Sequence, residues 1–189
     1  GLFDVRGFES RGRSVAAELA DVDGDGRIDL FVVVLAGIPP EETRRIRVYL
    51  QRPDGSLPAQ PDHEIAMPPL AAVYDVYDIR PETPGEELLV LLPDGVTILS
   101  LASAEGPRWS LAVPGATSVG VSVDERGLEP FRLVYREFGP EPWILVPQFG
   151  LLTALSPDGE VRAQLELPRR ANYFVIPTTG LLSLESDFQ

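Results

Sequence analysis

Short apolar runs separated by turns recur along the chain and limit its fold more than any other feature. The 189 residues include 19 Pro and 17 Gly, which interrupt the sequence too often for long helices. The runs between them are roughly five to eight residues long and rich in Val, Leu, Ile and Tyr, a composition typical of β-strands. We therefore predict an all-β fold, with strands in the runs 15–19, 30–35, 46–50, 88–92, 96–101 and 143–146.

A pattern of strand, turn and strand repeats within these runs. It occurs at 88–99, 143–155 and 174–184, where a Pro-Asp-Gly or Pro-x-x-Gly turn joins two apolar runs. We expect the glycine of each turn to adopt the positive φ that such a hairpin requires. The runs 30–35 and 45–50 form a similar pair with a longer connection. The units recur roughly every 50 to 60 residues, which is typical of four-stranded propeller blades.

This repeat predicts a single all-β domain, residues 1–189, built of β-propeller blades with four antiparallel strands each. We expect blades at 14–69, 70–115 and 116–168 and a partial blade at 169–189. About three blades are too few to close a ring. We therefore expect an incomplete ring that packs against further blades or another subunit, and not a free-standing monomer. A β-sandwich is the alternative fold.

The segment 21–29, Asp-Val-Asp-Gly-Asp-Gly-Arg-Ile-Asp, is the one motif that indicates a specific chemistry. It places carboxylates at loop positions one, three, five and nine, with a glycine at position six for a sharp turn. Calcium prefers about six to eight oxygen ligands at short range, so this segment predicts a Ca²⁺-binding loop. An EF-hand would need an acidic residue at position twelve and flanking helices. The chain has Val32 at that position, followed by more of a β-branched run.

With its flanks, this segment resembles the FG-GAP family, the integrin-type or VCBS-type β-propeller repeat. In that family a short strand leads into an Asp-x-Asp-Gly-Asp-Gly-x-x-Asp loop, and an apolar strand follows. The corresponding segments of this chain are 15–20, 21–29 and 30–35. The resemblance implies that calcium is held by side-chain oxygens of Asp21, Asp23, Asp25 and Asp29 and by the main-chain oxygen of Arg27.

Two later segments keep only part of the pattern. Segment 78–87 has one extra residue and carries Arg80 and Pro81 where ligands are expected, and segment 124–129 is similarly altered. A guanidinium in place of a carboxylate opposes cation binding. We therefore expect one calcium site per chain, with calcium preferred to magnesium because a flexible carboxylate loop suits the larger ion.

The charge of the chain restricts its partners. The formal net charge is −13 and the pI is about 4.4, which repels nucleic acid and anionic lipid and favours cations and basic protein surfaces. The absence of Cys excludes disulfides, Cys-ligated zinc and a thiol nucleophile. The apolar run 28–38 contains Asp29 and is too short to span a bilayer, so we expect no membrane insertion.

No residue pattern requires the chain to be an enzyme. His63 is the only histidine and lies beside a Pro-Asp turn, and the motifs of serine hydrolases, zinc proteases and phosphate-binding loops are absent. Trp109 and Trp143 alternate with apolar residues, which is typical of a core. Basic residues are almost all Arg, which favours a GC-rich bacterial source.

We therefore expect a calcium-binding propeller module of an exported bacterial protein, in the periplasm, at the cell surface or outside the cell. Its role would be binding, adhesion or assembly, with a protein or carbohydrate ligand. The alternative is a catalytic or non-catalytic part of a polysaccharide-active enzyme.

Overall fold

The computed structural model describes residues 12–38, 41–117, 128–136 and 139–166. Within these residues the regular elements are all β-strands, so the prediction of an all-β fold is confirmed. The strands are β1 (Arg13–Ala20), β2 (Asp29–Ala36), β3 (Thr43–Tyr49), β4 (His63–Ala66), β5 (Val73–Tyr77), β6 (Glu87–Leu92), β7 (Gly95–Ser100), β8 (Arg108–Ala112), β9 (Glu129–Pro130), β10 (Val134–Tyr135), β11 (Trp143–Gln148), β12 (Leu151–Leu155) and β13 (Val161–Glu166).

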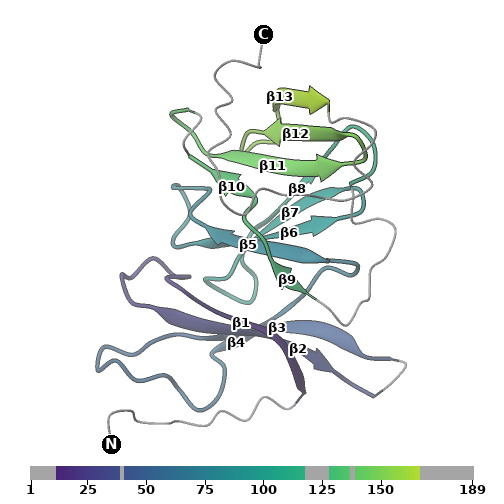
Figure 1. Ribbon diagram of the computed structural model, residues 1–189. Helices are drawn as coiled ribbons and strands as arrows, with labels where there is room; N and C mark the ends of the chain where they lie inside the picture. The colour runs from purple at the N-terminus through teal and green to yellow at the C-terminus, as the bar shows by residue number, and fades with distance from the viewer. Residues whose placement is uncertain (1–11, 39–40, 118–127, 137–138, 167–189) are drawn as a thin grey trace, which may run out of the picture.

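The strands form three sheets that follow one another in chain order. The first sheet has the order β1-β2-β3-β4 and the third has the order β10-β11-β12-β13, with antiparallel neighbours throughout. The second sheet has the order β8-β7-β6-β5-β9, in which β9 adds a short parallel pairing to β5. The sheets are stacked as three layers, and the described strands do not close into a barrel (Figure 1). Face-to-face packing of this kind is expected for blades and for the β-sandwich alternative alike.

The second sheet is buried on both faces, which explains the uninterrupted apolar run 88–92 in β6. Successive side chains of a strand point to opposite faces. In β6, Leu88 and Val90 join the hydrophobic cluster on the side of the first sheet, whereas Leu89 and Leu91 join the cluster on the side of the third. All four side chains are fully buried. The middle sheet therefore joins the two clusters into one continuous core.

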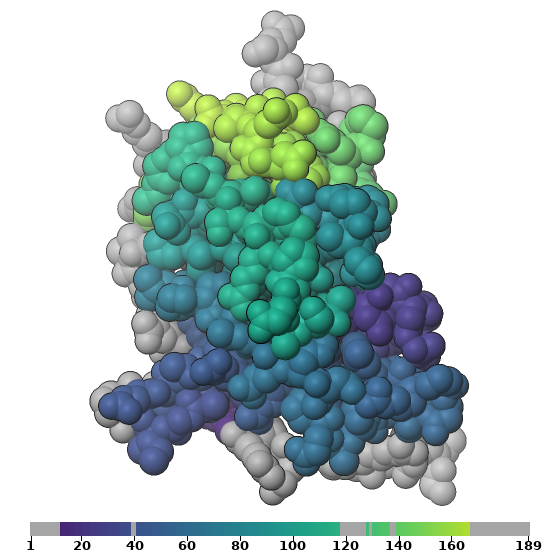
Figure 2. All heavy atoms as spheres, turned by 180° about the vertical axis from the view of Figure 1, so that it is seen from behind, coloured from purple at the N-terminus to yellow at the C-terminus, as the bar shows by residue number. Residues whose placement is uncertain are grey.

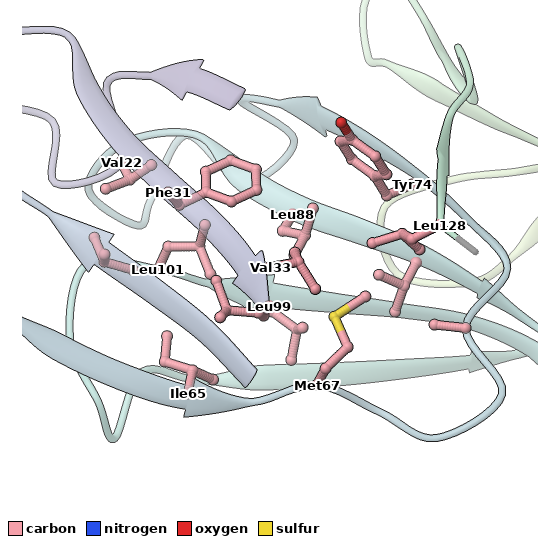
Figure 3. Close-up of a cluster of buried hydrophobic side chains, with 14 of the residues drawn as sticks. Val22, Phe31, Val33, Ile65, Met67, Tyr74, Leu88, Leu99, Leu101 and Leu128 are labelled. Carbon is pink, nitrogen blue, oxygen red and sulfur yellow. The ribbon is translucent and has the colours of Figure 1, made fainter. Parts of the chain in front are cut away.

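The cluster between the first and second sheets positions the strands that carry the candidate site. Phe31 and Val33 of β2 pack toward Leu88 and Leu99 of the second sheet (Figure 3). Val22, just after β1, is fully buried in the same cluster. Each such side chain contributes about 1.5–3 kcal/mol through removal of its apolar surface from water. The loop that follows β1 is thus anchored in the core at its second residue.

The two predicted hairpin glycines in the described residues behave differently. Gly150, between β11 and β12, has the expected positive φ of 71°. The same prediction for Gly95 is wrong, because Gly95 is the first residue of β7 and is not among the glycines with positive φ. A Cβ on Gly95 would lie 2.1 Å from the carbonyl oxygen of Leu111, so close strand packing explains this glycine.

The three sheets span residues 13–66, 73–112 and 134–166, with β9 joining the second of them. The predicted partial blade at 169–189, which includes the repeat at 174–184, lies outside the described residues. Nowhere in the described ranges is there a helix long and apolar enough to cross a membrane.

Candidate metal centre

The aspartate-rich segment joins the first two strands. β1 ends at Ala20 and β2 begins at Asp29, and these two residues pair across the hairpin. We refer to the connecting residues 21–28 as the Asp loop. Gly24 and Gly26 in this loop have φ values of +76° and +82°, which non-glycine residues adopt only at a cost. They let the backbone coil tightly enough to bring its carboxylates together.

The carboxylate of Asp21 organises the Asp loop. Its Oδ1 accepts hydrogen bonds from the backbone N–H groups of Gly24 at 2.8 Å and Asp25 at 3.1 Å. Its Oδ2 accepts another from the N–H of Gly26 at 2.9 Å. Aspartate commonly bonds to backbone N–H groups a few residues ahead in this way. The backbone therefore winds around the Asp21 carboxylate.

Asp29 forms the buried base of the site, with 0% of its surface exposed. Its Oδ2 accepts the N–H of Val22 at 3.0 Å and its Oδ1 accepts the N–H of Gln51 at 2.8 Å. Burial raises the pKa of Asp29; the two N–H groups lower it, and the charges of Asp23 and Asp21 raise it further. A divalent cation beside this carboxylate would favour its ionised form.

Three of the four predicted carboxylates meet in one place. Ligand oxygens of Asp21, Asp23 and Asp29 all lie within 4.8 Å of one another. Asp25 is not part of this group, because its Oδ1 accepts the N–H of Arg27 at 2.9 Å and its Oδ2 pairs with the Arg27 guanidinium. The structure thus turns the fourth carboxylate toward Arg27, the residue whose carbonyl oxygen was the fifth predicted ligand.

The donor set fits a hard divalent cation. Calcium–oxygen distances are about 2.3–2.6 Å, so two ligands of one ion lie at most about 5 Å apart. The spacing of the three carboxylates meets this limit. All donors are oxygen, with no histidine or sulfur among them, which suits calcium or magnesium better than zinc or copper. Asp21, Asp23 and Asp29 would hold the ion, which would offset the repulsion between their charges.

The Asp loop is docked onto the second sheet. Glu86, just before β6, donates its backbone N–H to the carbonyl oxygen of Asp21 at 2.8 Å, and its Oε2 accepts the Asp21 N–H at 3.1 Å. A Cβ on the neighbouring Gly85 would lie 2.4 Å from the Val22 carbonyl, so only glycine allows this approach. In Figure 2 the purple N-terminal strand and loop region reaches the surface beside the blue and teal second sheet. Metal binding would therefore act on the contact between the two sheets.

A second loop, residues 78–86 between β5 and β6, occupies the equivalent position in the second sheet; we call it the Arg loop. Tyr77 pairs with Glu87 as Ala20 pairs with Asp29. Glu87 is also fully buried, and its Oε2 accepts the backbone N–H groups of Ile79 at 2.9 Å and Arg80 at 3.2 Å. Burial raises the pKa of Glu87, although its hydrogen bonds oppose the rise. Glu87 is therefore the counterpart of Asp29.

The Arg loop carries its own cation. One guanidinium nitrogen of Arg80 donates to the carbonyl oxygen of Pro157 at 2.7 Å and to Asp158 at 3.0 Å, and another lies 3.2 Å from Glu82. Its guanidinium carbon is 4.7 Å from the centre of the Trp109 ring. Arg80 is only 9% exposed, so this charge is largely buried against Trp109 and the turn at 157–158. The Arg loop, all of whose residues are described, contains no set of three carboxylates spaced closely enough to share a metal ion.

The remaining candidate residues make contacts within the fold. His63 opens β4, and its Nε2 lies 2.7 Å from the carbonyl oxygen of Leu101. Trp109 packs at the edge of the cluster between the second and third sheets. The altered segment 124–129 is described only from residue 128 onward, so its comparison with the Asp loop lies outside the described residues. Sequence reasoning missed Gln51, whose backbone holds Asp29, because nothing in its own residue type marks it.

Comparisons with known proteins leave the site to be interpreted from its geometry. A scan against protein-family models finds no match to the chain. A search of curated protein sequences finds no match either.

Proposed function

We propose that the chain is a calcium-binding module of the FG-GAP type, part of an exported or cell-surface bacterial protein that acts in binding, adhesion or assembly. The observation that carries this proposal is the meeting of Asp21, Asp23 and Asp29 within 4.8 Å. The three stacked sheets, the resemblance of segment 21–29 to the family loop and the net charge of −13 support it. Calcium would act structurally, because the Asp loop contacts the second sheet through Glu86.

The role of the ion is to fix the junction between two sheets. Asp29 anchors the loop to β2, and Asp21 contacts Glu86 through both its backbone N–H and its carbonyl oxygen. An ion shared by these aspartates would bind the folded chain and not the unfolded one. At a free calcium concentration about 100 times Kd, this would stabilise the fold by about 2.7 kcal/mol.

Isothermal titration calorimetry of the full chain tests the proposal. We expect saturable calcium binding, with magnesium at least about tenfold weaker because it demands a smaller, more regular site. Asp23→Asn should weaken calcium binding strongly. Asp94→Asn, which removes the same charge from an exposed hairpin turn, should leave it unchanged. Absence of calcium uptake, or equal loss in both variants, would refute the proposal.

A further inference from the structure

A pocket of about 370 Å³ opens beside the Asp loop, where the first and second sheets meet. Its walls come from β1, β5, the end of the Arg loop and the segment 130–132. A volume of this size is at the lower end for small-ligand sites, and suits one extended side chain better than an oligosaccharide. The metal-site aspartates are not among its lining residues, so the pocket is a separate feature.

The lining of the pocket is strongly acidic. Three carboxylates, Glu18, Asp75 and Glu86, face a single basic lining residue among those described, Arg132. The Arg132 guanidinium lies over the ring of Tyr135, 4.6 Å from its centre. The formal charge of the lining is therefore negative at neutral pH. The field of the whole chain, with a net charge of −13, has the same sign.

Asp75 accepts hydrogen bonds that fix one wall of the pocket. Its Oδ2 accepts the backbone N–H groups of Leu133 at 2.7 Å and Val134 at 2.9 Å, and its Oδ1 accepts that of Val76 at 2.9 Å. These bonds tie β5 to β10 across one wall. Both oxygens already have donors, so Asp75 contributes charge and shape more than a free acceptor.

Glu18 and Glu86 each use only one carboxylate oxygen for hydrogen bonds within the described part of the chain. Glu18 Oε2 accepts the Tyr74 hydroxyl at 3.2 Å, and Glu86 Oε2 accepts the N–H of Asp21 at 3.1 Å. In both residues Oε1 accepts no hydrogen bond from the described part of the chain. Each carboxylate is thus fixed by one oxygen and open at the other.

Tyr74 fixes the geometry of this wall. The residue is 3% exposed, and its hydroxyl points away from the buried cluster (Figure 3). Burial raises the pKa of Tyr74 to about 12, and the charge of Glu18 adds to the rise. The phenol therefore stays protonated at neutral pH and continues to donate to Glu18. The acceptor on Glu18 is preorganised, which lowers the cost of ligand binding.

We propose that this pocket binds a basic side chain of a protein partner, with arginine preferred to lysine. A planar guanidinium presents five donors in a fixed fork, which suits two carboxylates on different walls. Its face also stacks on aromatic rings, and Phe131 lines the pocket. Complementary charge then selects a basic partner surface over a neutral sugar. The pocket carboxylates do not form a cluster with metal-site spacing in the described residues, which favours an organic cation.

Nuclear magnetic resonance titration of the full chain with N-acetyl-arginine amide tests this assignment. We expect saturable shifts at the amides of Leu19, Tyr74 and Phe131. The matched probe is N-acetyl-citrulline amide, which has nearly the same shape without the charge and should bind at least about fivefold more weakly. Equal binding of the two probes, or shifts spread over the whole surface, would overturn the proposal.

Variants locate the interaction. Glu18→Gln and Glu86→Gln should each weaken arginine binding at least about fivefold, since a charge-assisted contact becomes a neutral one. Glu105→Gln removes the same charge at an exposed turn and should have no effect. An equal loss in this control would show only general attraction to an acidic protein and would overturn the proposal.

A blocking variant covers the case in which the glutamine variants fold poorly. Leu19 is 61% exposed at the pocket wall, so Leu19→Arg should fold and fill the site with its own guanidinium, abolishing probe binding. Val161→Arg adds the same charge on β13, where the residue is 47% exposed, and should leave binding intact. Unchanged binding in Leu19→Arg would contradict the pocket's location. Repeating the Glu18→Gln comparison without calcium separates this proposal from the metal site, because Glu18 is held by Tyr74 whereas Glu86 bonds to the Asp loop.

Discussion

The Asp loop and the Arg loop join equivalent strands of neighbouring sheets but carry different charged side chains. In each, a buried carboxylate opens the next strand, Asp29 in one and Glu87 in the other. Each carboxylate accepts the N–H of a buried apolar residue two positions after the preceding strand. The Asp loop then places Asp21 and Asp23 beside its buried acid, whereas the guanidinium of Arg80 in the Arg loop contacts Glu82, Pro157 and Asp158.

This difference separates two roles of the acidic residues. The buried acid at the start of the strand belongs to the hairpin, because it caps backbone N–H groups whether or not other carboxylates are near. The acids added around it define the candidate metal centre. In the Arg loop, Arg80 reaches the third sheet through Pro157 and Asp158. The Arg80 side chain therefore connects the second sheet to the third. We assign the corresponding connection between the first and second sheets to calcium.

The largest expected effect comes from removing Glu87, the buried acid that follows the Arg loop and corresponds to Asp29. Glu87→Ala leaves the buried N–H groups of Ile79 and Arg80 without an acceptor and should lower the free energy of unfolding by about 3 kcal/mol. Urea denaturation with and without calcium measures it. The loss should be the same in both conditions. A loss below about 1 kcal/mol would mean that the capping role is unimportant.

A smaller effect is expected where the two loops touch. Gly85 has a φ of +78°, and a Cβ there would clash with the Val22 carbonyl. Gly55 has nearly the same φ of +79° with nothing within 4 Å of its Cβ position. Gly55→Ala isolates the backbone cost of about 1 kcal/mol. Gly85→Ala should cost about 1 kcal/mol more and also weaken calcium binding. Equal costs by thermal denaturation would show that the close approach is dispensable.

Replacing the internal cation should cost about 1 kcal/mol. Arg80→Met keeps much of the volume but loses the hydrogen bond to Pro157 and the stacking on Trp109. The loss is limited because the buried Nε of Arg80 has no acceptor among the described residues, and its removal relieves that penalty. Calcium affinity, measured on the same variant, should not change. A change in calcium affinity would mean that the Arg80 guanidinium itself acts on the metal site.

The smallest expected effect is a pH dependence in the calcium-free chain. Burial raises the pKa of Glu87, so this group stabilises the fold fully below its unfolded pKa of about 4.3, and that contribution is lost as pH rises through the folded pKa. Glu87→Gln does not titrate. Relative to the original chain, its stability should therefore improve as the pH rises above about 4. A decline over that range would contradict the direction of the shift.

The alternation of apolar runs and turns was enough to predict the β-fold, and carboxylate spacing was enough to predict where Asp21, Asp23 and Asp29 meet. The other features of the two loops depend on contacts that cannot be read from the spacing of residues in the sequence. Asp25 turns to Arg27 through a local ion pair that competes with the metal position. The equivalence of Glu87 to Asp29 is hidden by an extra residue and a longer side chain. Contacts of Arg80 with residues 157 and 158 join positions 77 and 78 apart.

We expect the Asp loop to bind calcium and the Arg loop, which carries Arg80, to bind none. Native mass spectrometry of the full chain in calcium, compared with Asp23→Asn and Arg80→Met, tests this expectation most directly. We expect one tightly bound calcium per chain, lost in Asp23→Asn and retained as a single ion in Arg80→Met. No bound calcium in the original chain, or a calcium ion that survives Asp23→Asn, would contradict it.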